Sequence, residues 1–336
     1  MTVEQGARII VEQWLRARPE QVLHFITDET KLTEAEAFRK ASENVGAVPK
    51  ISILSSEDIQ SGDCLEGIKQ VMSYADAIIG ATNYSFITTD AVRYALKRGS
   101  RFLSLPLSTN DGSSLLENEF LRMPPGKAGR IGRPMLPRLR LGREVRVTTD
   151  AGTNLHLSIR GRAPGLFNGI AAGPGACSSA SFEVFIPPVE TVTEGTVVLD
   201  GSMGYIGLVS EPLKLTFSGG MLTDIPDTPS GRRLRAFMES FGDPRIYCAA
   251  ELGIGLNTCS MCRGSSYIED ESSYGTFHIG FGRNLALGGS HDAAGHFDIV
   301  THAPTIAVDG FVIMDHGKAL RGPYPVNSRR MTAGSL

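Results

Sequence analysis

The sequence predicts an α/β amino-terminal domain, built on a parallel sheet with flanking helices, and a mostly β carboxy-terminal domain. Over residues 1–130, strand-like and helix-like segments alternate, which is typical of a parallel sheet covered by helices. From residue 144 onward the apolar residues recur with period two, which indicates strands with one buried face. A chain of 336 residues is also long enough for two cores. We therefore place the domains at residues 1–130 and 140–336.

Short aliphatic runs predict the strands of the first domain, at residues 22–26, 50–54, 76–80 and 101–105. Apolar residues at helical spacing predict the intervening helices, at residues 3–15, 33–46, 65–74 and 88–98. Thr33 and Glu36 form a capping box that opens the second of these helices, and Gly99 ends the last.

No glycine-rich nucleotide-binding motif or phosphate loop opens this domain, so no motif supports a nucleotide-binding role. Asn83, Tyr84 and Ser85 follow the third predicted strand, at the end of an α/β sheet where ligands commonly bind. These residues could line a cleft, although a polar surface loop is the simpler interpretation.

Residues 123–143 are rich in proline, glycine and arginine, a composition typical of a linker. We expect the domain boundary here, because composition and periodicity both change within this segment. Its basic residues could contact an acidic partner, but an exposed, solvated crossover is the simpler interpretation.

Alternating patterns predict most of the second domain as strands, at residues 144–148 and 154–160, within 181–201, and at 305–308 and 311–314. One helix interrupts these strands. Thr228 and Pro229 begin it, and Gly242 ends it.

Composition excludes several classes of function. The net charge is -3, so nothing indicates a nucleic-acid partner. The first residues lack the features of a signal peptide, and no apolar run is long enough to cross a membrane. We therefore expect a cytoplasmic protein without membrane contact. The cysteine count of 5 is odd, and Cys259-Ser-Met-Cys262 has no second pair, so we expect reduced thiols.

Histidine and carboxylate residues gather in the last third of the chain. In a strand, His296 and Asp298 project to the same side, and both are good ligands for zinc, iron or manganese. Taken alone, this pair could simply face water. However, Glu251 lies in an apolar, glycine-spaced run and His278 lies between two apolar residues. A buried carboxylate needs a partner, a proton or a cation, so a metal cluster becomes the better interpretation.

Glu183 is a further candidate for a buried carboxylate, because it lies among apolar residues and no lysine or arginine occurs within ten positions on either side. We expect it to approach the same metal centre as Glu251, since a cation is the nearest available compensation for its charge.

Several of these runs resemble the metal-binding domain of the M29 aminopeptidases, the aminopeptidase T type. They are EVFIPPVE at Glu183, AELG at Glu251, GTFHIGFG at His278, and His296-Phe-Asp298. The resemblance covers about residues 140–315. It implies a cleft between the domains and two divalent ions, zinc, cobalt or manganese, held by Glu183, Glu251, His278, His296 and Asp298. It also implies Glu183 and Glu251 as candidate catalytic residues, a metal-activated water, a peptide or small amide as substrate, and a homodimer. Leu285 occupies the position of that family's tyrosine ligand.

Residues 237–247 are similar to a stretch of the 2,5-dihydroxypyridine 5,6-dioxygenases, which share this fold and use one non-haem iron. In that case His278, His296 and Asp298 could form a site with two histidines and one carboxylate for Fe(II), and Glu183 or Glu251 could act as a base. That group has a histidine ligand where this chain has Glu251, and a catalytic histidine near the position of Ser85.

The ligand count favours the hydrolase, with the Fe(II) dioxygenase as the alternative. A third interpretation is a homologue that has lost catalysis and binds a peptide or another small ligand. Metal content would separate the three: two zinc, cobalt or manganese ions, one ferrous iron, or none.

Overall fold

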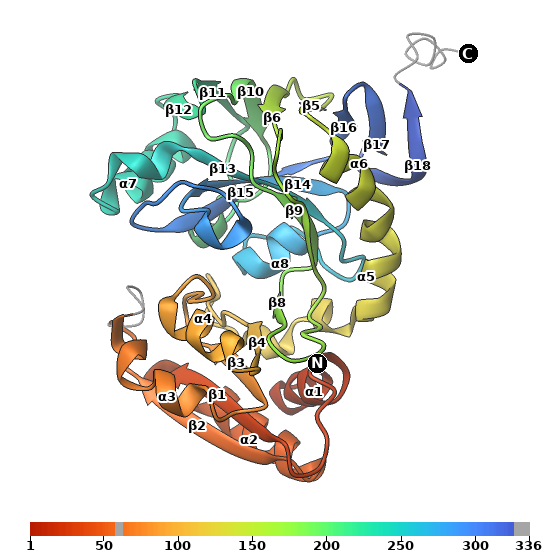
Figure 1. Ribbon diagram of the computed structural model, residues 1–336. Coiled ribbons are helices and arrows are strands. Elements are labelled where there is room, and N and C mark those ends of the chain that lie inside the picture. Colours follow the sequence, from red (N-terminus) through yellow and green to blue (C-terminus); the bar gives the residue numbers. More distant parts are fainter. Residues whose placement is uncertain (58–62, 326–336) are drawn as a thin grey trace.

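The computed structural model describes residues 1–57 and 63–325, and it consists of an α/β part and a β-rich part (Figure 1). The amino-terminal part contains a parallel sheet with flanking helices. The carboxy-terminal part contains two antiparallel sheets. The predicted fold class is confirmed.

Sheet A has five parallel strands in the order β2 (Val48–Leu54), β1 (Val22–Asp28), β3 (Ala77–Ala81), β4 (Arg101–Ser104) and β8 (Cys177–Ser179). Its main helices are α1 (Val3–Ile9), α2 (Leu32–Asn44), α3 (Lys69–Met72) and α4 (Asp90–Lys97). A π-helix, η1 (Ile10–Trp14), continues α1. The first four strands of the sheet therefore lie where the sequence predicts strands.

The predicted capping box at Thr33 and Glu36 is wrong. Helix α2 begins at Leu32, after a 3-10 turn, η2 (Glu29–Lys31). Asp28 caps that turn by accepting a hydrogen bond from the backbone N–H of Thr30. The chain has therefore entered helical geometry before it reaches Thr33.

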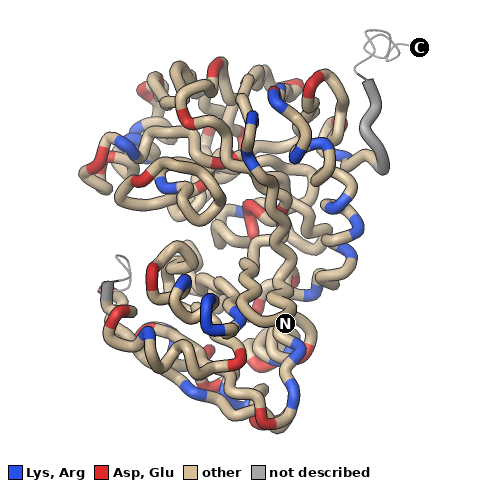
Figure 2. Tube along the Cα trace, viewed as in Figure 1, with Lys and Arg blue, Asp and Glu red and all other residues tan. Residues whose placement is uncertain are grey.

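The proline- and arginine-rich segment is helical rather than an open loop. It forms α5 (Pro125–Gly132), η6 (Arg133–Met135) and α6 (Leu136–Leu141). Ala128, Met135 and Leu139 pack into the core, while most of the basic side chains are exposed, as the blue positions along α5 and α6 show (Figure 2). The domain boundary within this segment stays a prediction.

Strand β8 was not predicted. It follows α6 by more than thirty residues and returns to sheet A, where it pairs with β4. Its residues, Cys177, Ser178 and Ser179, show no apolar alternation. The chain therefore crosses from the β-rich part back to the α/β part before it enters β9.

Sheet B has eight strands in the order β12 (Met221–Asp224), β11 (Leu213–Ser218), β10 (Glu194–Leu199), β6 (Asn154–Ser158), β5 (Glu144–Thr148), β16 (Thr305–Val308), β17 (Phe311–Asp315) and β18 (Lys318–Pro325). Sheet C has five, in the order β15 (His296–His302), β14 (Thr276–Gly282), β13 (Ala249–Gly255), β9 (Glu183–Ile186) and β7 (Gly165–Phe167).

The predicted helix of this part is α7 (Pro229–Ser240), and Thr228 caps it as expected. A shorter helix, α8 (Tyr267–Ser272), was not predicted. A continuous cluster of buried apolar residues includes members of all three sheets and of α1, α6 and α7. Burial of this surface stabilises the contact between the two parts. Among the described residues, no helix is long and apolar enough to span a membrane.

Candidate metal centre

Strand register brings the five predicted ligands together on sheet C. Each ligand has a glycine opposite it on the neighbouring strand. Gly280 lies opposite both Glu251 and Asp298, Gly253 lies opposite His278, and the pairs Gly255–Glu183 and Gly282–His296 complete the set. Residues that lie opposite each other, or two apart on one strand, point to the same face of a sheet. The candidate ligands therefore share one face of sheet C, and each has a glycine beside it on the next strand.

Two of these glycines make room for the ligands. A Cβ atom added at Gly253 would lie 1.8 Å from Nε2 of His278. A Cβ atom at Gly280 would lie 2.7 Å from Cε1 of His296 and 2.8 Å from Oδ1 of Asp298. Real Cβ atoms do not approach this closely, so the imidazole and carboxylate groups occupy space that only glycine leaves free.

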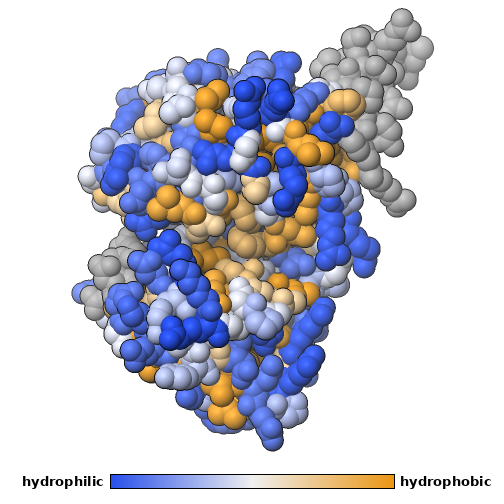
Figure 3. Space-filling view, viewed as in Figure 1, coloured by the Kyte–Doolittle hydropathy of each residue, from blue (hydrophilic) through white to orange (hydrophobic). Residues whose placement is uncertain are grey.

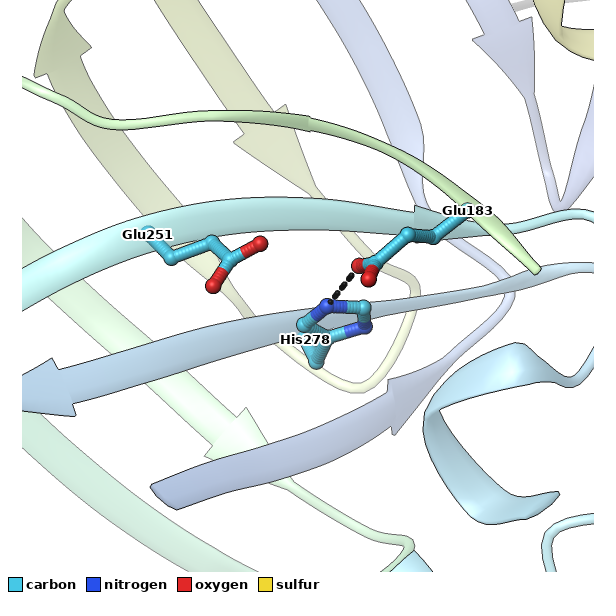
Figure 4. A group of neighbouring side chains, drawn as sticks. All are labelled: Glu183, Glu251 and His278. Carbon is cyan, nitrogen blue, oxygen red and sulfur yellow. Dashed lines mark ion pairs between the residues drawn. The ribbon is translucent and has the colours of Figure 1, made fainter. Parts of the chain in front are cut away.

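The ligands form two overlapping groups. In the first, one atom each of Glu183, Glu251 and His278 lie within 4.8 Å of one another, and in the second the same holds for Glu251, His296 and Asp298. Figure 4 shows the first group, with the two carboxylates and the imidazole turned toward one another across three strands. Glu251 belongs to both groups.

The closest contacts lie between histidine nitrogens and carboxylate oxygens. Nε2 of His278 lies 2.7 Å from Oε2 of Glu183. Nε2 of His296 lies 3.1 Å from Oε2 of Glu251 and 3.5 Å from Oδ1 of Asp298. Each imidazole therefore faces carboxylate oxygens through the same nitrogen.

A backbone carbonyl fixes the orientation of His296. Its Nδ1 lies 2.8 Å from the carbonyl oxygen of Arg283. A carbonyl can only accept a hydrogen bond, so Nδ1 carries a proton and Nε2 is turned to the carboxylates. Histidines that bind metals are commonly oriented by such a bond from the nitrogen that does not bind the ion.

The four ligands Glu183, Glu251, His278 and Asp298 are 5%, 4%, 1% and 6% exposed. Burial raises the pKa of Glu251 to about 7, and the nearby charge of Glu183 adds to this rise. Burial by itself lowers the pKa of His278, but the Glu183 carboxylate outweighs it and raises that pKa to about 9.

The second group follows the same pattern. Burial lowers the pKa of His296, but Asp298 and Glu251 raise it well above its usual value. Burial raises the pKa of Asp298, and His296 more than reverses this effect. With the protein's own groups alone, protons on the imidazoles therefore offset the carboxylate charge.

The donor set fits a divalent cation. Oε2 of Glu183, Oδ1 of Asp298 and Nδ1 of His278 are buried and have no hydrogen-bond partner within residues 1–57 and 63–325. The contacts of the two carboxylate oxygens with histidine are short but lack hydrogen-bond alignment. The other oxygen of Glu183 accepts a hydrogen bond from Ser181. Carboxylate oxygens and imidazole nitrogens that converge in this way are suitable ligands for zinc, manganese or iron.

Sequence reasoning missed Glu271, which lies on α8 beside the centre. Burial and the charge of Asp298 raise its pKa well above the usual value, and the two carboxyl groups share a hydrogen bond. The raised pKa favours the protonated form of Glu271, in which its carboxyl group would donate a hydrogen bond to Asp298. The acidic run Glu269-Asp270-Glu271 is typical of an exposed helix, so no pattern in the sequence marks Glu271 as buried.

A cavity of about 570 Å³ opens over the ligands between the two parts. Figure 3 shows the hollow, with apolar surface along it. Its walls include Tyr84 and Ser85 from the loop after β3, so the cleft interpretation holds for these two residues. Asn83 instead donates a hydrogen bond to Thr30.

Aromatic side chains form much of the remaining wall. Tyr205 packs against Tyr267 with ring centroids 4.3 Å apart, and it lies 5.9 Å from the ring of Tyr84 in the other part. Phe237 and Phe241 of the α7 region extend this wall. The cavity thus combines an anionic floor with flat aromatic sides.

Other candidate residues lie apart from the centre. His302 pairs with Asp200, and His316 pairs with Asp315. Cys177, Cys248, Cys259 and Cys262 are free thiols, as expected. Leu285 is 44% exposed and does not line the cavity.

A parallel α/β part joined to two antiparallel sheets, with histidine and carboxylate ligands on one of them, defines a class of two-part proteins with a candidate divalent-metal site. Within that class the chain belongs to one family. The model of the family described as 2,5-dihydroxypyridine 5,6-dioxygenase (NicX) matches residues 2–321.

A curated relative in Pseudomonas putida (strain KT2440), 2,5-dihydroxypyridine 5,6-dioxygenase, is 27% identical over 174 residues. That match covers 48% of this chain and only 49% of the relative. The solved structure of 2,5-dihydroxypyridine dioxygenase from the same organism has a TM-score of 0.80 at 19% identity, over 95% of this chain and 98% of that one.

The structure of AmpT from Thermus thermophilus has a TM-score of 0.67 at 14% identity, again over 95% of this chain and 98% of that one. At these identities the two structures show a shared fold. The predicted resemblance to this superfamily is confirmed.

Proposed function

We propose that this chain is a metal-dependent hydrolase of the aminopeptidase T type that acts on a peptide or small amide. The observation that carries the proposal is the position of Glu251, which belongs to both ligand groups. Three carboxylates and two imidazoles would provide enough ligand atoms and negative charge to hold two divalent ions, and Glu251 would contribute to both groups. Zinc, cobalt or manganese would suit this set.

Two divalent ions bound here would polarise an amide carbonyl and lower the pKa of a bound water. The chain's own residues supply position and proton control. The Arg283 carbonyl holds His296 with Nε2 toward the centre. A protonated Glu271 would donate a hydrogen bond to Asp298 and so orient that carboxylate. Glu183 and Glu251 are the candidate catalytic carboxylates, because both belong to the ligand groups and line the cavity above them.

A ring-cleaving Fe(II) dioxygenase is the second candidate. Two observations favour it: membership of the family over residues 2–321, and the aromatic wall of Tyr205, Phe237 and Tyr267, which suits a flat ring. His278, His296 and Asp298 would then hold the iron. A cytoplasmic location and a homodimer also stay predictions.

Metal content together with two activity assays tests the proposal. The purified chain is analysed for metals, then assayed for hydrolysis of aminoacyl anilides and dipeptides with zinc, cobalt or manganese. After anaerobic loading with Fe(II), oxygen uptake is measured with 2,5-dihydroxypyridine. About two ions per chain with hydrolysis supports the first candidate. One iron with oxygen uptake supports the second, and no metal with neither activity contradicts both.

The substitution Glu183→Gln separates the candidates further, because it keeps the size of the side chain and removes its charge. In a two-ion hydrolase, the variant should lose about one ion per chain and its hydrolytic activity. Glu269→Gln is the matched control, since Glu269 is also a buried carboxylate but does not line the cavity. If Glu183→Gln keeps full metal content and activity, the two-ion proposal is wrong.

A further inference from the structure

A second cavity, of about 650 Å³, lies at the other end of sheet A. The end of η1, the residues just before β3 and β4, and the loop at residues 170–174 form its walls. Tyr84 and Ser85 of the metal-centre cavity follow the carboxyl end of β3, whereas Asp76 of this cavity precedes β3. The two cavities share no lining residue, so this is a separate place in the fold.

The charge in this cavity is strongly one-sided. Arg16, Arg18, Arg98 and Arg101 line it, and Asp76 is the one carboxylate among the lining residues. Within residues 1–57 and 63–325, none of these arginines forms an ion pair with a carboxylate. The whole chain has a net charge of -3, so this concentration of positive charge is local.

Contacts within the protein compensate little of the positive charge of these arginines. Oδ2 of Asp76 accepts a hydrogen bond from the backbone N–H of Val22 at 2.7 Å. The guanidinium of Arg98 lies over the ring of Tyr94, 4.3 Å from its centroid. Burial lowers the pKa of Arg101, the charge of Asp76 opposes this effect, and the nearby Arg18 adds to it. Asp76 is thus the one carboxylate among the lining residues, and it faces four guanidinium groups.

The wall also holds donors without acceptors. Nη1 of Arg101 donates to the carbonyl oxygens of Leu15 at 2.8 Å and Ala171 at 3.4 Å. Nη2 of Arg101 and Nε1 of Trp14 are buried and, among the described residues, have no hydrogen-bond partner. Buried polar groups are nearly always paired. The cavity therefore lacks a hydrogen-bond acceptor. An anion would supply one, and the excess of arginine in the cavity also favours an anion.

We propose that this cavity binds a small organic anion that carries a phosphate or carboxylate group. The guanidinium fork matches both groups through paired, charge-assisted hydrogen bonds. The volume is in the range of small-molecule sites, and Trp14, Tyr74 and Ile170 add apolar surface for the rest of the ligand. Arg101 links the residue after η1 to the loop before β8 through Leu15 and Ala171, so a bound anion would also hold these two segments together beside β4.

The single tryptophan of the chain, Trp14, lies in the cavity and provides the measurement. The intact, metal-loaded protein is titrated with inorganic phosphate and, separately, with succinate, with sodium chloride at equal ionic strength as the reference. Tryptophan emission should change in a saturable way, and the melting temperature should rise with the same concentration dependence. Saturation by only one of the two anions supports the proposal and identifies the anionic group.

The double variant Arg18→Gln and Arg98→Gln removes two exposed guanidinium groups that form no ion pairs, so the fold should be kept, as a thermal melt checks. Its dissociation constant should rise at least ~10-fold. The matched control, Arg130→Gln and Arg140→Gln, makes the same charge change on exposed positions outside the cavity and should bind like the parent. No saturable change with either anion, or equal weakening in both double variants, overturns the proposal.

Discussion

His24 in β1 and His278 in β14 are both 1% exposed on strands of five-stranded sheets, yet their pKa values move in opposite directions. Burial lowers the pKa of His24 to about 4, and Lys50 adds to this effect. Burial acts in the same direction on His278, but the Glu183 carboxylate reverses it and raises the pKa to about 9. Burial therefore keeps His24 neutral, whereas a carboxylate partner outweighs the same burial effect at His278.

The two sheets satisfy their buried histidines in different ways. In sheet A, Nε2 of His24 shares a hydrogen bond with the hydroxyl of Ser52 at 2.8 Å, which is a neutral partner. In sheet C, three carboxylates surround two imidazoles with few hydrogen bonds among them. Nδ1 of His24 and Nδ1 of His278 are both buried and have no hydrogen-bond partner among the described residues. The two sites differ instead in charge: His24 contacts a neutral hydroxyl, whereas His278 lies among carboxylates whose charge a cation would compensate. This contrast distinguishes a structural histidine from a candidate ligand.

The substitution Glu251→Gln should produce the largest effect, because it removes the carboxylate common to both ligand groups. We expect metal content below one ion per chain and activity reduced at least ~100-fold, measured by elemental analysis and by the assays described above. Glu269→Gln should change neither quantity. Retention of metal by Glu251→Gln would mean that the two groups are independent of this residue.

The substitution Gly280→Ala tests whether His296 and Asp298 need the space that a glycine leaves at this position. The added methyl would contact His296 and Asp298 at 2.7 and 2.8 Å, so it should displace ligands and destabilise the fold by about 1–3 kcal/mol. A chemical denaturation curve and a metal titration measure both effects. Gly67→Ala is the control, since a Cβ there meets nothing within 4 Å. Normal metal affinity in Gly280→Ala would contradict the arrangement of ligands and glycines.

The substitution His24→Gln tests the other side of the comparison and should have the smallest effect at neutral pH. The pKa of His24 is about 4 when folded and about 6.5 in an unfolded chain. As pH falls below 6.5, the unfolded state takes up a proton that the folded state refuses, so stability falls between pH 6.5 and 4, by up to about 3 kcal/mol. Above pH 6.5 this contribution is constant.

His24→Gln removes this titration while it keeps a hydrogen-bonding side chain, so its stability should fall less than that of the parent over this range. Denaturation curves between pH 7 and 4.5 measure the difference. His316→Gln, at an exposed histidine, should retain the steeper decline of the parent. Parallel curves for all three proteins would show that His24 does not keep its neutral form.

The candidate ligands that meet on sheet C could be predicted from the sequence because carboxylate or imidazole residues stand out within apolar runs. Glu251 and His278 are the clearest cases. Glu271 was not accessible, since its neighbours are acidic and its burial results from the packing of α8 against sheet C. The helix start at Leu32 was misplaced because the Asp28 cap acts through a 3-10 turn, which the capping-box pattern does not describe.

Pairing between strands that are far apart in the chain was the second feature that the sequence did not predict. The main strands of sheet A were predicted from local patterns. Strand β8 pairs with β4 across more than seventy residues of chain, and three small or polar residues carry no signal for that contact. Likewise, the opposition of Gly280 to both Glu251 and Asp298 depends on register, which a single strand does not specify.

The return of β8 to sheet A has a consequence for synthesis on the ribosome. Domains commonly fold as units while the chain emerges, starting with the amino-terminal one. Here the fifth strand of that first sheet ends at Ser179. Until then, one edge of β4 in the nascent chain offers unpaired backbone groups to any other strand. Sheet A therefore cannot be completed until residues 177–179 have been synthesised. In a fragment that stops at residue 130, that edge of β4 would stay unpaired.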